Sequence, residues 1–112
     1  MKMYFAVLDE VPSHMVPVLV AHAAVGAHIH IQRNALPHYF KLHNTWLRDS
    51  FRKVVVKVNR KEFNKIAAIP EVYLAHENTT LEGSKSCAVI VVDEEIPNVL
   101  KFAKLWSPNE SN

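Results

Sequence analysis

The stretch Cys87-Ala-Val-Ile-Val-Val92 decides the fold class, because it is apolar throughout instead of alternating between apolar and polar residues. Met3-Tyr-Phe-Ala-Val-Leu8 is a second run of this kind, and Lys53-Val-Val-Val-Lys57-Val58 has the β-branched composition of a third strand. Unbroken apolar strands belong to a sheet that is buried on both faces, so helices must cover both sides of it. We therefore predict an α/β fold, namely a three-layer α/β/α sandwich around a small mixed sheet of about four strands.

A long helix is expected after the first strand. Ser13 is a good N-cap for a helix over residues 13–31, and Pro17 is tolerated in its first turn. One stripe of this helix, at three- and four-residue spacing, consists of Met15, Val18, His22, Val25 and Ile29. The opposite side is also apolar, so we expect other elements to cover most of the helix circumference. Gly26 would let another backbone approach this helix closely.

The rest of the chain is expected to alternate between short helices and strands. A mixed segment over residues 39–51 is anchored by aromatic and apolar residues and leads into the strand over 53–58. Asn59 caps a helix over 60–68, and a brief strand over 72–74 precedes a polar loop. Acidic residues at 93–95 suit the start of a last helix that runs through Trp106. We expect one domain over residues 1–106 and a disordered tail over 107–112.

Length and composition are those of a single soluble globular domain. The chain has 112 residues, of which 49% are hydrophobic and 21% are charged. Its one cysteine, Cys87, excludes an internal disulfide and is typical of a reducing compartment, so we expect a cytoplasmic protein. The apolar run over residues 15–31 contains three histidines and a proline, so we expect no membrane span.

Charge is distributed unevenly along the chain. The formal net charge is only +2, but residues 41–65 hold eight basic side chains against Asp49 and Glu62. Such a segment can bind phosphate groups, and it can equally be a solvated strand edge and helix face. The candidate nucleic-acid-binding residues are Arg52, Lys53, Lys57, Arg60 and Lys61.

Three pieces of sequence occur in an order that points to a known family. His22-Ala-Ala-Val-Gly-Ala27 lies on the first helix, Trp46 precedes the strand over 53–58, and Thr79-Thr-Leu-Glu-Gly-Ser84 leads into the last apolar strand. Together they resemble the type-2 (archaeal and eukaryotic) peptidyl-tRNA hydrolases over about residues 3–92. The resemblance implies a small mixed sheet between helices, an often dimeric protein, and cleavage of the ester that joins a peptide to the 3′ end of tRNA.

The residues of this family's active site are only partly matched. His22 matches the family's helix histidine, and Thr79 matches its loop threonine. Met15 stands where the family has a lysine, and Ala75-His76-Glu77 stands where it has a loop aspartate. Leu19 and Ala21 replace a glutamine and a serine of the family. The resemblance further implies ligand-binding roles for His76, Thr80, Ser84 and Ser86.

These replacements remove chemistry that ester hydrolysis requires. The reaction needs an activated water and a donor for the oxyanion, and neither Met15 nor Ala75 supplies them. We therefore expect a diverged, non-catalytic protein that binds a small ligand, a partner or a tRNA-like molecule.

Two alternatives remain at this stage. One is an active hydrolase in which Glu77 and a histidine, His22 or His76, take the roles of the missing groups. Thr79 would be a third residue of that active site. The other is an RNA-binding module that uses the basic segment over residues 53–65. Seven histidines without paired cysteines or a His-Glu-x-x-His pattern predict no metal site, and we expect no cofactor.

Overall fold

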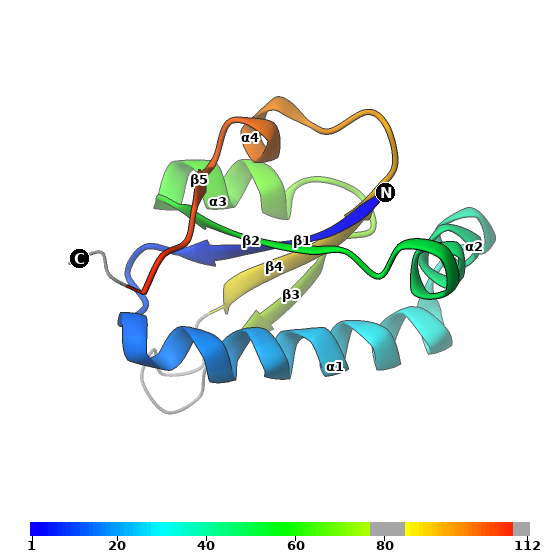
Figure 1. Ribbon diagram of the computed structural model, residues 1–112, viewed down its shortest axis with the longest axis horizontal. Coiled ribbons are helices and arrows are strands. Elements are labelled where there is room, and N and C mark those ends of the chain that lie inside the picture. Colours follow the sequence, from blue (N-terminus) through cyan, green and yellow to red (C-terminus); the bar gives the residue numbers. More distant parts are fainter. Residues whose placement is uncertain (77–84, 109–112) are drawn as a thin grey trace.

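The computed structural model of this chain describes residues 1–76 and 85–108 (Figure 1). Its five strands form one sheet in the order β3-β4-β1-β2-β5. The strands are β1 (Lys2–Leu8), β2 (Lys53–Val58), β3 (Tyr73–His76), β4 (Lys85–Val92) and β5 (Lys104–Leu105). β1 and β2 are parallel, whereas the other neighbours are antiparallel. The mixed α/β sheet is therefore confirmed, with five strands instead of the expected four.

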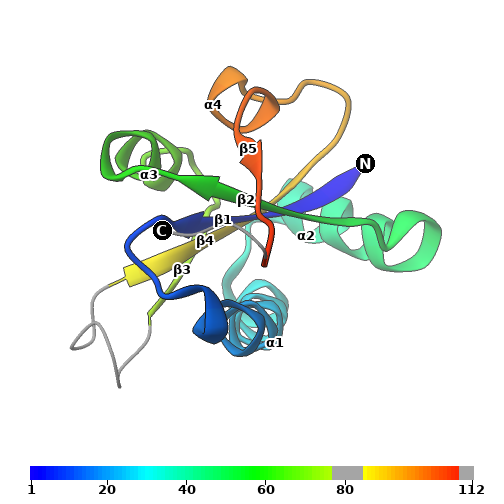
Figure 2. The same cartoon turned by 60° about the vertical axis from the view of Figure 1, so that its left-hand side comes forward.

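Helices lie on both faces of this sheet. α1 (Val16–Asn34) runs along one face, and α3 (Arg60–Ala67) and α4 (Asn98–Lys101) lie on the other (Figure 1, Figure 2). α2 (Pro37–Thr45) and a π-helical turn over Trp46–Ser50, called the π-turn below, connect α1 to β2. Residues 3–8 and 86–92 are buried throughout, as the unbroken apolar runs predict.

α1 buries only one of its sides. Its buried residues are Val16, Leu19, Ala23, Ala27 and Ile31. Val18, Val25 and Ile29 belong to the other side, where 69%, 62% and 45% of each residue's surface is exposed. The expectation that other elements cover most of this helix is wrong, because no second layer of the described chain lies on its outer side (Figure 2).

The start of α1 also differs from the expectation. Ser13 begins a separate 3₁₀ turn, Ser13–Met15, and α1 itself begins at Val16. Met15 occupies the N-cap position and makes no side-chain capping hydrogen bond there. Pro17 lies in the first turn as predicted, where its missing N–H would have no partner within the helix.

Gly26 permits close contact with a side chain and not with a backbone. A Cβ atom at Gly26 would lie 2.5 Å from the hydroxyl oxygen of Tyr73 and 3.1 Å from the ring atom that carries it. Tyr73 begins β3, so its ring packs across α1 at the one position where that helix has no side chain. The predicted close approach to Gly26 occurs, but its partner is the side chain of Tyr73 and not the expected backbone.

α3 begins as the sequence predicts. The side chain of Asn59 accepts a hydrogen bond from the backbone of Glu62, whose carboxylate accepts one from the backbone of Asn59, both at 2.8 Å. This reciprocal capping box satisfies two N–H groups that have no partner within the helix. The strand that follows α3, β3, begins one residue later and ends two residues later than expected.

The predicted last helix is mostly absent. α4 covers only Asn98–Lys101, the acidic residues 93–95 lie in the preceding connection, and the chain then forms β5 beside β2. The backbone N–H of Trp106 donates to the carbonyl oxygen of Val55 at 3.0 Å. Residues 104–106 thus form hydrogen bonds along part of the outer edge of β2. The predicted helix would have left these backbone groups of β2 without a partner strand. Of the predicted disordered tail, residues 109–112 lie outside the described residues.

One described helical stretch, Ser13–Asn34, is long and apolar enough to cross a membrane by length and composition alone, with a mean hydropathy of 1.3. In this structure 28% of that apolar window is buried. Core helices of soluble proteins pass the same test. The absence of a membrane span therefore stays a prediction.

Candidate functional site

A cavity of about 320 Å³ lies where α1, the π-turn and β2 meet. Its walls are mainly aliphatic and aromatic, and three ionisable side chains interrupt them. The lining residues are Met3, Ala24, Val25, His28, His43, Trp46, Leu47, Phe51 and Lys53. An apolar cavity with a few converging polar groups is the usual form of a small-molecule site.

The π-turn shapes one wall of this cavity. The backbone N–H of Phe51 donates to the carbonyl oxygen of Trp46 at 2.7 Å, which closes a turn one residue wider than an α-helical turn. Phe51 then adopts a left-handed conformation with φ of 61°. A residue with a Cβ atom pays roughly 1–2 kcal/mol for this conformation. The turn places the rings of Trp46 and Phe51 side by side, with 5.3 Å between their centroids.

Trp46 is held firmly between the π-turn and β2. Its indole N–H donates to the carbonyl oxygen of Arg52 at 2.8 Å, and its ring is buried. The ring of His43, on the preceding α2, lies 5.5 Å from the ring of Trp46 between centroids. The aromatic wall is therefore preformed by contacts within the protein.

Two histidines meet at the cavity. The Nδ1 atom of His28, on α1, lies 3.2 Å from the Nε2 atom of His43, on α2. His43 is fully buried, and its Nδ1 atom has no hydrogen-bond partner among the described residues. Burial lowers the pKa of His43 below its usual value of 6.5, and the nearby charge of His28 lowers it further. His43 is consequently neutral at neutral pH.

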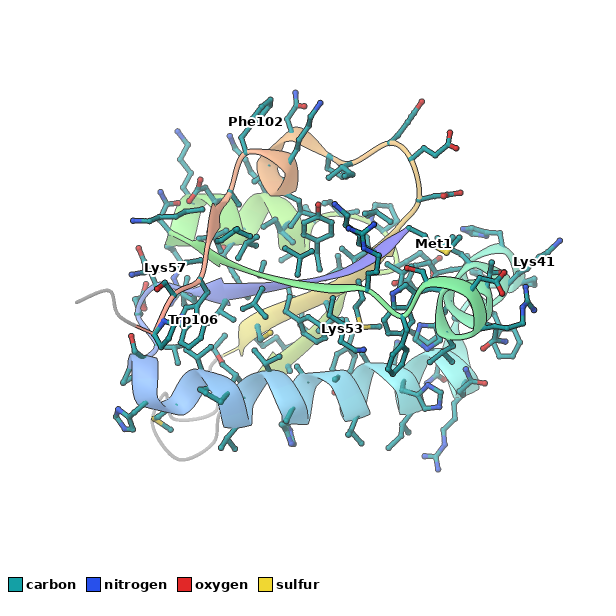
Figure 3. The ribbon with its side chains drawn as sticks, in the orientation of Figure 1. Met1, Lys41, Lys53, Lys57, Phe102 and Trp106 are labelled. Atoms are coloured by element: carbon teal, nitrogen blue, oxygen red, sulfur yellow. The ribbon has the colours of Figure 1, made fainter. Side chains whose placement is uncertain are left out.

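Lys53 supplies the cation of this site. Its Nζ atom lies 3.1 Å from the ring centroid of Phe51 and 5.4 Å from that of Trp46, and it donates to the carbonyl oxygen of Phe51 at 2.9 Å. Figure 3 shows Lys53 on β2, beside the α1 layer. None of the nine lining residues is an aspartate or a glutamate, so the cavity wall carries positive charge only.

The family-based candidate residues lie elsewhere or outside the described part of the chain. His22 is exposed on α1, does not line the cavity, and makes no hydrogen bond or ion pair with any described residue. Glu77, Thr79, Thr80 and Ser84 lie outside the described residues, and His76 is the last residue of β3.

Ser86 is the candidate residue whose environment the structure describes best. It is fully buried in β4, and its hydroxyl oxygen has no hydrogen-bond partner within the described residues. Because Ser86 does not line the aromatic cavity, it is not part of the same site.

The candidate nucleic-acid-binding residues are divided between two layers. Lys53 and Lys57 are on β2, within the sheet. Arg60 and Lys61 begin α3, which covers the face of the sheet opposite α1 (Figure 1). Arg60 forms an ion pair with Glu10 at 2.7 Å, and Arg52 is exposed just before β2. The structure thus brings only Lys53 of this group to the aromatic cavity.

The cavity itself was not predicted from the sequence. His28 and His43 are separated by 15 residues, and neither belongs to a recognisable ligand motif. The only signal was the aromatic content of residues 39–51, which is equally typical of core anchors. Within the described residues, no group of three or more His, Cys, Asp or Glu side chains could hold a metal ion.

Comparison with known proteins identifies no relative. No protein-family model matches the chain, and no curated protein matches its sequence. The function must therefore be argued from the site and from the sequence itself.

Proposed function

We propose that this chain is a small-molecule-binding domain, a diverged and non-catalytic form of the type-2 peptidyl-tRNA hydrolase fold. Its ligand occupies the cavity between α1, the π-turn and β2. The observation that carries this proposal is the preformed aromatic wall beside the contact between the exposed His28 and the buried His43. The mixed sheet with helices on both faces is the architecture that the family resemblance implies.

Unfavourable local features concentrate around the cavity. They are the left-handed Phe51, the π-turn before it, and the buried Nδ1 atom of His43, which has no hydrogen-bond partner among the residues that the structure describes. Each of these reduces stability, and features of this kind cluster at ligand-binding and catalytic sites. Their coincidence supports a binding role for the cavity over a purely structural one.

The loss of catalytic groups supports a binding function over hydrolysis. Met15 takes the position of the family's lysine, and Ala75, which takes the position of its aspartate, is buried in β3. An aliphatic side chain cannot activate water or stabilise an oxyanion. Incubation with peptidyl-tRNA tests the hydrolase alternative, which requires turnover above that of a His22→Ala variant.

The RNA-binding alternative has less support, because its basic residues are divided between the sheet and α3, and Arg60 is paired with Glu10. If several of these residues contacted phosphates, tRNA binding would weaken steeply as salt is raised. A cytoplasmic location, expected from the single cysteine, and a homodimer, implied by the family resemblance, remain part of the proposal.

The neutral fluorescent probe N-phenyl-1-naphthylamine tests the proposed cavity directly. In a Trp106→Phe background Trp46 is the only tryptophan, so energy transfer from Trp46 detects bound probe, and the variants described next locate it. We expect saturable binding at one site per chain.

A pair of matched variants on α1 makes this test specific. Ala24 lines the cavity, whereas Ala21 is exposed on the same helix, so Ala24→Phe fills the cavity and Ala21→Phe leaves it open. We expect Ala24→Phe to abolish probe binding and Ala21→Phe to retain it, with circular dichroism confirming that both fold. Equal binding by the two variants would contradict the proposal.

A further inference from the structure

The charge of the cavity restricts what its ligand can be. Its ionisable lining residues are His28, His43 and Lys53, and none of its lining residues in the described part of the chain is acidic. The nearest acid in sequence, Asp49, is already paired with Arg48 at 2.8 Å and does not line the cavity. A cationic ligand would therefore meet only like or neutral charge, whereas an anionic ligand would meet an opposite charge.

Lys53 is positioned to accept an anion. Its ammonium group has three N–H donors, and the structure gives it one hydrogen bond, to the carbonyl oxygen of Phe51. Among the described residues no carboxylate pairs with Lys53. The remaining contacts of its Nζ atom are with the rings of Phe51 and Trp46, and such contacts are weak at exposed positions. A carboxylate at this point would gain charge-assisted hydrogen bonds, which are stronger than neutral ones.

The shape of the cavity favours a flat ligand body. The ring of Phe51, which is 55% exposed, lines the cavity together with the small side chains of Ala24 and Val25, and the buried ring of Trp46 supports Phe51 from behind at 5.3 Å between centroids. Stacked and tilted ring contacts stabilise aromatic partners beyond the effect of area alone. A volume of about 320 Å³ suits a molecule of about two fused rings.

We infer that the ligand is a planar aromatic carboxylate, with its rings against the exposed Phe51 and its carboxylate on the Nζ atom of Lys53. This inference rests on the proposed function, because it names the class of molecule that the same cavity takes. It differs from a nucleotide ligand, since the wall offers few polar groups to a ribose or to the edge of a base.

Three probes of one shape and different charge test this inference. They are 2-naphthoate, the neutral 2-naphthamide and the cationic 2-naphthylmethylammonium, each used to displace N-phenyl-1-naphthylamine. We expect 2-naphthoate to bind at least about tenfold more tightly than the amide, and the ammonium compound to bind most weakly. Adenosine monophosphate is added as a fourth competitor and is expected to bind more weakly than 2-naphthoate.

Two lysines of one strand provide the matched variants. Lys53→Met removes the cation of the cavity, whereas Lys57→Met removes a lysine of β2 that does not line it. We expect Lys53→Met to abolish the preference for 2-naphthoate, Lys57→Met to keep it, and Lys53→Arg to keep it as well. The Lys53→Arg variant also separates loss of charge from loss of fold.

The outcomes separate this inference from the proposed function. Three results would overturn the inference alone. The first is equal affinity for naphthoate and naphthamide, and the second is tighter binding of the ammonium compound or the nucleotide than of naphthoate. The third is a carboxylate preference that survives in Lys53→Met. Failure of every probe, including N-phenyl-1-naphthylamine, would overturn the proposed function together with it.

Discussion

The Nδ1 atom of His28 lies 3.2 Å from the Nε2 atom of His43, so a hydrogen bond between two imidazoles joins α1 to α2 beside the cavity. One imidazole must donate and the other must accept, which requires at least one of the two rings to be neutral. The buried ring, His43, is the one that its surroundings keep neutral. This contact makes the α1–α2 junction sensitive to acid.

Acidification is expected to lower stability through His43. Its pKa is lower in the folded chain than the usual value of 6.5, so the unfolded chain takes up this proton first as the pH falls. The free energy of unfolding should therefore decrease below about pH 6.5 and level off once the pH has passed the native pKa. Urea denaturation at a series of pH values measures this slope.

Two histidine variants test whether His43 causes this dependence of stability on pH. His43→Gln should remove this part of the pH dependence, although it lowers stability at every pH. His22→Gln is the control, because His22 is exposed on α1 and should leave the slope unchanged. An unaltered slope in His43→Gln would assign the acid sensitivity to other groups.

Gly26→Ala is expected to destabilise the fold although alanine favours helix. The new Cβ atom would lie 2.5 Å from the hydroxyl oxygen of Tyr73, which must move away. We expect a net loss of up to about 2 kcal/mol, because overpacking costs about 1–3 kcal/mol and the helix-propensity gain is about 1 kcal/mol. In a Tyr73→Ala background the same substitution should become stabilising, and thermal denaturation of the four proteins measures this reversal of sign.

Tyr39 is expected to be a stabilising anchor between α2 and β4. Its hydroxyl oxygen accepts a hydrogen bond from the backbone N–H of Val91 at 2.8 Å in a buried setting. Tyr39→Phe leaves that N–H unpaired and should cost about 1–3 kcal/mol in urea denaturation. Tyr73→Phe is the control, because the hydroxyl of Tyr73 accepts no backbone hydrogen bond among the described residues.

The same tyrosine should make the fold sensitive to alkali. Burial raises the pKa of Tyr39 from 10.0 to about 12, so the folded chain holds this proton more tightly than the unfolded chain. Its stabilising contribution is complete below about pH 10 and is lost as the pH rises toward 12. The loss should be smaller in Tyr39→Phe, and an identical alkaline transition in both proteins would contradict the assignment.

Glu71→Gly is expected to stabilise the protein. Glu71 has a φ of 74°, which strains any residue with a Cβ atom. Glycine relieves that strain in the folded chain, but it also increases the entropy of the unfolded chain, which lowers stability. The net effect should raise the free energy of unfolding by about 0.5–1 kcal/mol. Its contact with His38 at 3.9 Å involves a largely exposed histidine and adds little. Glu71→Ala, which keeps the Cβ atom, should show no such gain.

The sheet could be predicted from the sequence with few errors. β1, β2 and β4 lie within a residue or two of the predicted runs, because a strand buried on both faces needs apolar residues without interruption. The N-cap at Asn59 was predicted for a similar reason, since a cap depends on residues close in the chain, and the structure adds the reciprocal hydrogen bond to Glu62. β5 was missed because pairing with β2, and not local sequence, makes residues 104–105 extended.

The environment of α1 could not be predicted in the same way. Both of its sides are apolar, so hydrophobic periodicity does not tell which side faces the sheet. The stripe with Val18, Val25 and Ile29 proved to be the exposed one. His22 shares that stripe, so the residue that pointed most clearly to a family lies in solvent and not in the cavity.

The sequence by itself determined the layers of this protein: which runs form the buried strands, where α3 begins, and that helices must cover both faces. Those features depend on residues that are neighbours in the chain. Only the tertiary structure decided the cavity, because His28, His43 and Lys53 come from three separate elements and meet through packing. The left-handed Phe51 is likewise imposed by the closure of the π-turn. Local pattern thus specifies the scaffold, whereas contacts between distant elements specify the site.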